Sequence, residues 1–487
     1  MLDHAPPTPA GPDGDTMALL RSAGQSLAEQ LASRLAGRIR DRLLPPGARL
    51  PSVRQCAAQQ GLSPSTVVAA YDQLLAQGLV VAERGRGYFV RSPSAARKAA
   101  SPGAERMAAP VNAAALIRGM FHPAGSRPQP GMGVLPPDWL ETPFVGLALR
   151  RVTQPASLAE STLRYGEPQG DGHLRRVLAD RLQALGVPAE AGQIITTVGA
   201  THALDIVSRT LLRPGDAVLV EEPGWAVEFA RLAAMGVRIL PVPRGPQGPD
   251  LNVMQRLCEA HAPKLYVSVS VLHNPTGACL SPASAHRVLQ LAQRFGFYIV
   301  EDDTYSHIAP EHATRLSVLD GLQRTIYVSG FAKILAPNWR VGFLVAPDAL
   351  RERLLDTKLL GTLTTPSLLE RAMALCIEQG HLRRHAQRVR QRLDEARARS
   401  TALAQDNGCR FVAEPAGLFG WVDTGVDTEA LAQRLLDHDI LIAPGALFHA
   451  QRAPSTLMRI NFAATQDAAF WRRFVAARQA MGGSASA

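Results

Sequence analysis

Hydrophobic residues recur at a helical spacing in the first part of the chain. Leucine or isoleucine stands at every fourth position from 27 to 43, which predicts a helix with one buried face. A short second helix is expected from Ser52 to Gln60, with Ser52 as its cap. A third helix is expected to begin at Ser63, to bury Val67, Tyr71, Leu74 and Leu75, and to close at Gly78.

The hydrophobic pattern changes after the third helix. The stretch LVVAERGRGYFV, at 79–90, predicts two short strands joined at Arg84–Gly87. Two helices joined by a tight turn form a helix-turn-helix, and a basic hairpin behind it is a wing placed to meet phosphates. A small helical assembly module is the alternative interpretation of this region.

From about residue 160 onward, short apolar runs alternate with helical stretches. The runs are AVLV, LYVSVSV, FYIV, TIYVS and GFLVA, at 217–220, 265–271, 297–300, 325–329 and 342–346. Buried strands alternating with helices predict an α/β fold with a large, mostly parallel sheet. Such sheets bind ligands at the carboxyl ends of their strands.

The distribution of charge also separates the N-terminal helical region from the α/β region that follows it. Residues 20–100 contain twelve Lys and Arg against four acidic residues, so that +8 of the net charge of +10 lies there. A basic module predicts a polyanionic partner. The chain is interpreted as a disordered tail at 1–20, a DNA-binding domain at 21–91, an Ala/Ser/Pro-rich linker at 92–125 and an effector domain at 126–480. An extra helix through the linker alanines is the alternative.

The cysteines and the apolar runs indicate where in the cell the protein is located. The five cysteines are far apart and lack CxxC spacing, which predicts reduced thiols and no metal site. No run approaches the ~18 apolar residues that a membrane span needs. We therefore expect a cytoplasmic protein without a membrane partner.

Lysine is rare in this chain. Only four of its 52 basic residues are lysines, at positions 98, 264, 333 and 358. Arginine stays charged, whereas a lysine in a dry site can lose its proton and condense with a carbonyl. Lys333, which lies between two apolar runs, is therefore a candidate amine nucleophile.

Polar side chains follow three of the predicted strands. Asn274, Asp302 and Lys333 stand about 30 residues apart, which is the length of a βαβ unit, so they are expected to meet in one crevice. Tyr305 follows Asp302 closely. Further candidates are a phosphate-binding turn at a helix start, a cationic clamp and an aromatic ring that stacks on a ligand: Gly199, Ala200 and Thr201; Arg340; and Trp225.

These side chains match the needs of one cofactor. Pyridoxal 5'-phosphate requires a lysine amine, a carboxylate that keeps its ring nitrogen protonated, donors at its phenolic oxygen and a phosphate cradle. We assign these roles to Lys333, Asp302, the pair Asn274 and Tyr305, and the turn at 199–201. Each residue alone has a structural explanation as a turn, a cap or a core aromatic.

The basic module resembles the GntR family over PPGARLPSVRQCAAQQGLSPSTVVAAYDQLLAQGLVVAERGRGYFV. The shared patterns are Leu-Pro-Ser-x-Arg, Thr-Val, Ala-Tyr, Gly-Leu-Val and a Gly-x-Gly wing. The family often has arginine where this chain has Pro64, which removes one direct base contact. The resemblance implies a DNA-contacting set of Arg49, Ser52, Arg54, Ser63, Ser65, Thr66, Arg84, Gly85 and Arg86.

Residues from about 130 to 475 resemble the fold-type-I aminotransferases. YGEPQGDGHLRRVLADRL matches the segment whose tyrosine, Tyr165 here, reaches the cofactor phosphate of the partner subunit. GFAKILAPNWRVG matches the lysine segment, and LMRINFA makes Arg459 the residue that binds a substrate carboxylate. Relatives have serines where this chain has Gly330 and Ala332, so Ser329 is expected to supply a phosphate contact instead.

The order of the two modules resembles the MocR subfamily of transcriptional regulators. The resemblance implies a head-to-tail homodimer that binds a double-stranded DNA operator and responds to a small amine or a B6 vitamer. Two alternatives remain open. One is an active aminotransferase, and the other is a DNA-binding protein whose large domain only dimerises.

Overall fold

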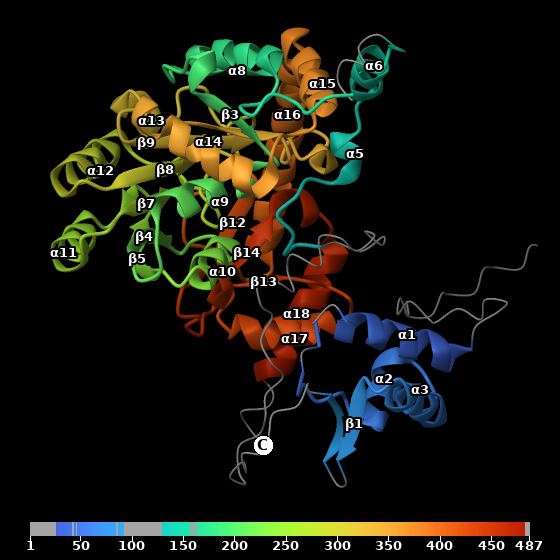
Figure 1. The fold of residues 1–487 in the computed structure, drawn as a ribbon. Helices are drawn as coiled ribbons and strands as arrows, with labels where there is room; N and C mark the ends of the chain where they lie inside the picture. The colour runs from blue at the N-terminus through green and yellow to red at the C-terminus, as the bar shows by residue number, and fades with distance from the viewer. Residues whose placement is uncertain are drawn as a thin grey trace, which may run out of the picture. The chain divides into compact units, whose positions relative to one another are not determined.

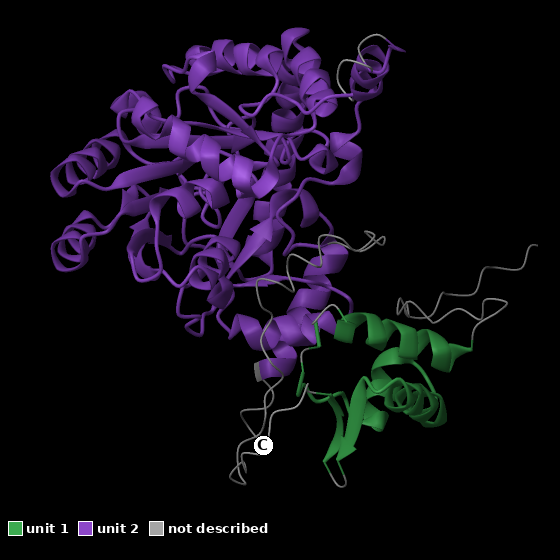
Figure 2. Ribbon diagram, viewed as in Figure 1, with its two compact units in different colours: residues 1–122 green, residues 123–487 purple. Residues whose placement is uncertain are grey.

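The computed structural model describes residues 26–40, 43–44, 46–83, 86–91, 129–155, 158 and 163–482. The chain divides into two compact units, residues 1–122 and residues 123–487 (Figure 2). The predicted tail at 1–20, the predicted linker at 92–125, and Arg84 and Gly85 lie outside the described residues.

The first unit is a winged helix-turn-helix. It contains α1 (Leu27–Arg40), α2 (Val53–Gln60), α3 (Pro64–Ala76), β1 (Val80–Glu83) and β2 (Gly87–Val90) (Figure 1). The two strands pair antiparallel. These elements confirm the helices and the hairpin that the sequence predicted, although α1 ends at Arg40.

Local sequence explains where the helices of this unit begin. Ser52 caps α2 in a capping box with Gln55, and Ser63 caps α3 with Pro64 in the first turn. The predicted inner face of α3 is buried at Val67, Tyr71 and Leu74, whereas Leu75 is only half-buried.

The second unit is built on an eight-stranded sheet in the order β3-β10-β9-β8-β7-β4-β5-β6. The strands are β3 (Ile194–Thr197), β4 (Ala217–Glu222), β5 (Arg238–Gly245), β6 (Gly248–Pro249), β7 (Leu265–Ser268), β8 (Tyr298–Asp302), β9 (Thr325–Gly330) and β10 (Gly342–Val345). β9, β8, β7, β4 and β5 run parallel, while β10 is antiparallel to both neighbours. The mostly parallel sheet confirms the predicted α/β class.

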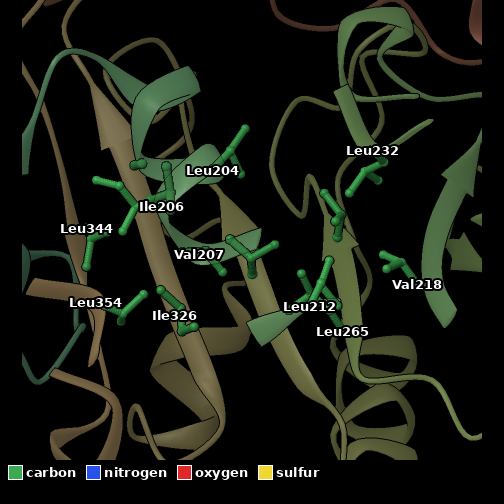
Figure 3. Close-up of a cluster of buried hydrophobic side chains, with 14 of the residues drawn as sticks. Leu204, Ile206, Val207, Leu212, Val218, Leu232, Leu265, Ile326, Leu344 and Leu354 are labelled. Atoms are coloured by element: carbon green, nitrogen blue, oxygen red, sulfur yellow. The ribbon is translucent and has the colours of Figure 1, made fainter. Parts of the chain in front are cut away.

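Helices cover both faces of this sheet. One buried cluster joins α9 (Ala200–Leu211), α10 (Ala226–Ala234) and α14 (Asp348–Thr362) to the strands, as Figure 3 shows for Leu204, Val207, Ile326 and Leu354. A second cluster joins α11 (Leu251–His261), α12 (Pro282–Phe295) and α13 (Leu316–Asp320) to the other face. Alternate strand residues, such as Val300 and Ile299, enter opposite clusters.

A smaller sheet completes the second unit. Its order is β11-β12-β14-β13, formed by Arg410–Phe411, Phe419–Asp423, Leu457–Asn461 and Ala443–Pro444. The remaining helices are α5 (Pro137–Leu140), α6 (Pro143–Val152), α8 (Gly172–Ala184), α15 (Ser367–Glu378), α16 (His381–Asp406), α17 (Thr428–Leu436) and α18 (Ala468–Gly482). Within the described ranges, no helix is long and apolar enough to cross a membrane.

Candidate functional site

Lys333 lies in the turn that follows β9. Its Nζ donates a hydrogen bond to the carbonyl oxygen of Gly133 at 2.7 Å. Burial lowers the pKa of Lys333 from 10.5 to about 8, and the positive charge of Arg459 acts in the same direction. About a tenth of this lysine is therefore uncharged at pH 7, and the uncharged amine is the form that attacks a carbonyl.

Asp302 is the last residue of β8, beside β9 in the sheet. One carboxylate oxygen accepts a hydrogen bond from Thr304 N at 3.1 Å. Burial raises the pKa of Asp302 to about 7, because a charged carboxylate is poorly solvated there. It forms no ion pair with another described residue, so the carboxylate is suited to a cationic ligand group such as a protonated ring nitrogen.

Arg459 brings the small sheet into the same site. From β14 its Nη1 donates to Asn274 Oδ1 at 2.8 Å, and its side chain is buried between the rings of Phe419 and Phe448. Burial lowers the pKa of Arg459 to about 10. Tyr305 packs edge-on against Phe419, and burial raises the pKa of its hydroxyl, which is hydrogen-bonded to Asn274. Asn274, Tyr305 and Arg459 therefore form one polar cluster.

The segment 129–134 also enters this site, and the sequence did not predict it. Gly131 O accepts a hydrogen bond from Arg459 Nη2 at 2.6 Å, while Gly133 O accepts from Lys333. Asn461 Nδ2 donates to the carbonyl oxygens of Met132 and Val134. The Gly-x-Gly spacing is a local signal for this segment. A Cβ on Gly131 would lie 2.5 Å from the backbone carbon of Ile442, so that glycine is required there.

The predicted phosphate turn lies at the start of α9. Gly199 has a φ of 80° and precedes the first amides of α9, at Ala200 and Thr201, which have no acceptor within the helix. Arg340 Nη2 donates to Val198 O at 3.2 Å, and a Cβ on Gly199 would lie 2.5 Å from the same nitrogen. The guanidinium therefore lies directly over the turn. Helix dipole and arginine together form a cradle for an anion.

The structure does not bring Ser329 to this cradle. Its hydroxyl donates to Asp303 O at 2.9 Å, and the side chain is buried. Gly330, the next residue, faces α9 instead, since its Cβ would lie 3.4 Å from Ala200 N. The alternation of side chains along β9 explains the difference.

Two predicted cofactor contacts, Trp225 and Tyr165, lie outside the polar cluster of Asn274, Tyr305 and Arg459. Trp225 stands at the N-cap of α10 and packs against the buried cluster of α9, α10 and α14. The Tyr165 side chain is 84% exposed. A residue that acts on another subunit is expected to be exposed within its own chain.

The predicted DNA-contacting residues of the first unit lie at its surface. Arg49, Arg54, Ser65 and Arg86 are exposed. Arg86 pairs with Glu83 at 2.6 Å, and a Cβ on Gly87 would lie 3.5 Å from Arg49 Nε, so Arg49 approaches the wing.

Hydroxyl groups gather at the start of α3. Ser63 Oγ lies 2.8 Å from Ser65 Oγ and 2.7 Å from Thr66 Oγ1, and it accepts from Thr66 N. The Ser52 hydroxyl likewise accepts from Gln55 N. Ser52 and Ser63 therefore also serve as helix caps.

Comparison with known proteins supports the fold assigned to each of the two units. The pattern of the aminotransferase class I and II family matches residues 140–477, and that of the gntR family of bacterial regulatory proteins matches residues 27–90. LysN, an α-aminoadipate aminotransferase from Thermus thermophilus, was solved in complex with N-(5'-phosphopyridoxyl)-L-leucine. It superposes with a TM-score of 0.66 at 25% identity, covering 72% of this chain and 92% of LysN. This chain therefore belongs to the class of proteins in which a winged helix-turn-helix is joined to a fold-type-I aminotransferase domain.

Two relatives share both units. The HTH-type transcriptional regulator YjiR of Escherichia coli (strain K12) is 30% identical over 461 residues, which cover 89% of this chain and 94% of YjiR. YisV of Bacillus subtilis (strain 168) is 25% identical over 446 residues, covering 86% of this chain and 89% of YisV. The chain belongs to the GntR-type regulators that carry an aminotransferase domain of classes I and II, the MocR subfamily.

Proposed function

We propose that this protein is a pyridoxal-phosphate-dependent transcriptional regulator that senses an amino compound in the cytoplasm. The observation that carries the proposal is the single cluster formed by Lys333, Asp302 and Arg459, three groups whose pKa values burial shifts. Perturbed pKa values gathered in one site favour chemistry over packing.

The residues present fit pyridoxal phosphate. The cofactor supplies an aldehyde for amines and a ring that withdraws electrons. Lys333 offers the amine, and Asp302 offers a carboxylate without an ionic partner among the described residues. Asn274 and Tyr305 would hold the ring oxygen, while the turn at 199–201 and Arg340 would hold the phosphate. Trp225 would stack on the ring, and Ser329, whose hydroxyl donates to Asp303 O, would support the strand end.

The effector class follows from Arg459. Its Nε is buried and has no hydrogen-bond partner among the described residues, and its Nη2 is bonded only to a backbone carbonyl. A carboxylate is a stronger acceptor than a carbonyl oxygen and fits the planar guanidinium. An amino acid, with its carboxylate at Arg459 and its amine toward Lys333, is therefore the expected effector, and a free B6 vitamer is the alternative.

The segment 131–133 can transmit ligand binding at the site to the part of the chain that precedes it. A carboxylate bound at Arg459 would compete with Gly131 O for Nη2, and a carbonyl that reacts with Lys333 would remove its hydrogen bond to Gly133 O. This segment follows residues 92–128, which connect the two units in the chain. Ligand binding therefore changes the hydrogen bonds of the segment next to the connection, as linkage between effector and DNA requires.

Fluorescence anisotropy of the full chain on DNA from beside its own gene tests the proposal. The duplex is compared with a scrambled duplex of equal length, with and without pyridoxal phosphate and amino acids. Selective binding that shifts with cofactor and amino acid is expected. Equal, salt-sensitive binding to both duplexes would show a basic patch without regulation.

An active aminotransferase is the second candidate. Arg459, Asp302 and Tyr305, retained together with Lys333, make transamination chemically possible. Turnover of an amino donor with an oxo acid, lost in Lys333→Ala, would establish the activity. The proposal also includes a head-to-tail homodimer, in which Tyr165 of each subunit reaches the phosphate bound by the other.

A further inference from the structure

Lys358 is a second buried lysine in a chain that uses arginine almost everywhere. It lies in α14, and its side chain is fully buried. Its Nζ donates to Pro168 O at 2.6 Å and lies 3.5 Å from Thr196 Oγ1. A lysine has a compact head that fits where the larger guanidinium fork does not.

An acidic residue balances this lysine from the next helix. Glu370, in α15, is 2% exposed, and one of its carboxylate oxygens accepts a hydrogen bond from Asp171 N at 2.7 Å. Burial lowers the pKa of Lys358 to about 8, while the charge of Glu370 opposes this shift. Two buried side chains therefore hold the turn at 166–171, Lys358 at Pro168 and Glu370 at Asp171.

The turn at 166–171 is also confined by close contacts. Gly170 has a φ of 105°, and a Cβ there would lie 1.8 Å from Thr196 Oγ1. A Cβ on Gly166 would lie 2.5 Å from Ser367 Oγ. Thr196 N donates to Gln169 O at 2.8 Å. The backbone of this turn therefore has little freedom to move.

An exposed tyrosine precedes this confined turn. Tyr165 is 84% exposed, and Leu163 is 79% exposed two residues earlier. Leu360, near the end of α14, is 91% exposed. The Tyr165 ring is therefore accessible to a molecule outside its own chain. A rigid base beneath an exposed side chain is what presentation to a second subunit requires.

We propose that Lys358 and Glu370 are positioning residues, which hold the turn at 166–171 so that Tyr165 meets the cofactor phosphate bound by the other subunit. The inference rests on the proposed function. It makes the cofactor affinity of one subunit depend on two buried residues of its partner. Neither residue is assigned a contact with the cofactor.

The first experiment compares dissociation constants for pyridoxal phosphate, measured by absorbance titration of the full-length protein. Lys358→Met is expected to weaken binding about tenfold, as the loss of a charged, buried hydrogen bond implies. Tyr165→Phe should shift the constant in the same direction. Lys264→Met, at an exposed lysine before β7, is the matched control and should bind as the unmodified protein does.

Mixed dimers then separate action across the interface from general damage. One subunit carries Lys358→Met and the other carries Lys333→Ala, with two affinity tags to isolate the mixed species. Only the first subunit keeps the reactive lysine, and it receives an intact turn from its partner. We expect one site per dimer with the unmodified dissociation constant.

Three results would overturn the inference. Normal binding by the Lys358→Met homodimer would remove the role of Lys358, and a mixed dimer as weak as that homodimer would place its effect within its own subunit. Failure of the unmodified protein to bind pyridoxal phosphate would overturn the proposed function as well. If Lys358→Met does not fold, Glu370→Gln, which keeps the shape and removes the charge, takes its place in both experiments.

Discussion

The two units place their functional side chains in opposite environments. In the first unit, Arg49, Arg54 and Arg86 are exposed, and they come from a short stretch of chain. In the second unit, Asn274, Tyr305 and Arg459 are at most 6% exposed and come from distant parts of the sequence. A solvated surface binds through many weakly coupled charges, whereas a buried site depends on a few strongly perturbed groups. Substitutions should therefore have large effects in the second unit and small ones in the first.

Removal of the reactive amine should have the largest effect. Lys333→Ala is expected to abolish the visible absorption that the protein gains with pyridoxal phosphate, because no other lysine lies in the cluster around Asp302 and Arg459 within the described residues. An absorption spectrum after dialysis measures this. Lys264→Ala, the control at the exposed lysine, should keep the full absorption, and a fully yellow Lys333→Ala protein would refute the assignment.

Loss of the carboxylate-binding guanidinium comes next. Arg459→Gln should weaken the response to an amino acid about a hundredfold, as expected for removal of one partner of a buried charged pair. Titration of the DNA-binding change with the amino acid gives this value. Arg410→Gln, at an arginine whose side chain is 81% exposed, should leave the response unchanged. An equal loss in both variants would show that the guanidinium of Arg459 has no specific role.

The rate of cofactor capture should depend on pH through Lys333. Its pKa is lowered from 10.5 to about 8, and only the uncharged amine reacts. The rate should rise about tenfold per pH unit below 8 and level off above it. Stopped-flow absorbance measures the profile. Arg459→Gln removes a cation that lowers this pKa, so its profile should shift to higher pH, and an unshifted profile would contradict the coupling.

A single DNA contact in the first unit should matter less. Arg54→Gln is expected to weaken operator binding about five- to tenfold and to reduce the slope of log affinity against log salt by about 1. Anisotropy at several salt concentrations provides both values. Arg238→Gln, at an exposed arginine of the second unit, serves as the control. A hundredfold loss from Arg54→Gln would break the contrast between the units.

The smallest effect is expected from a helix cap. Ser63→Ala should destabilise α3 by about 1 kcal/mol, because Thr66 N loses its acceptor. Hydrogen exchange of the full chain would then show about fivefold faster exchange in α3. The helix α12, capped by Ser281 in the second unit, is an internal control that should not change. Unchanged exchange in α3 would show that water replaces the cap without cost.

Much of the fold follows from local patterns. The helices of the first unit, their caps and its hairpin match the predicted positions because each depends on residues within one or two turns. The parallel strands β4, β7, β8 and β9 also match predicted apolar runs. Their order is consistent with Asn274, Asp302 and Lys333 at one edge, since β7, β8 and β9 are neighbours.

Long-range packing decided the rest. The sequence alone determined which side chains are available: a rare lysine, carboxylates and amides at strand ends, and glycines at turns. Only the tertiary structure placed the antiparallel β10 between β3 and β9, turned Ser329 away from α9, and brought the carbonyls of Gly131 and Gly133 to Arg459 and Lys333. It also brought Lys358 and Glu370 to the backbone of the turn before α8. Contacts between residues separated by hundreds of positions depend on the burial of whole elements, and no local pattern contains that information.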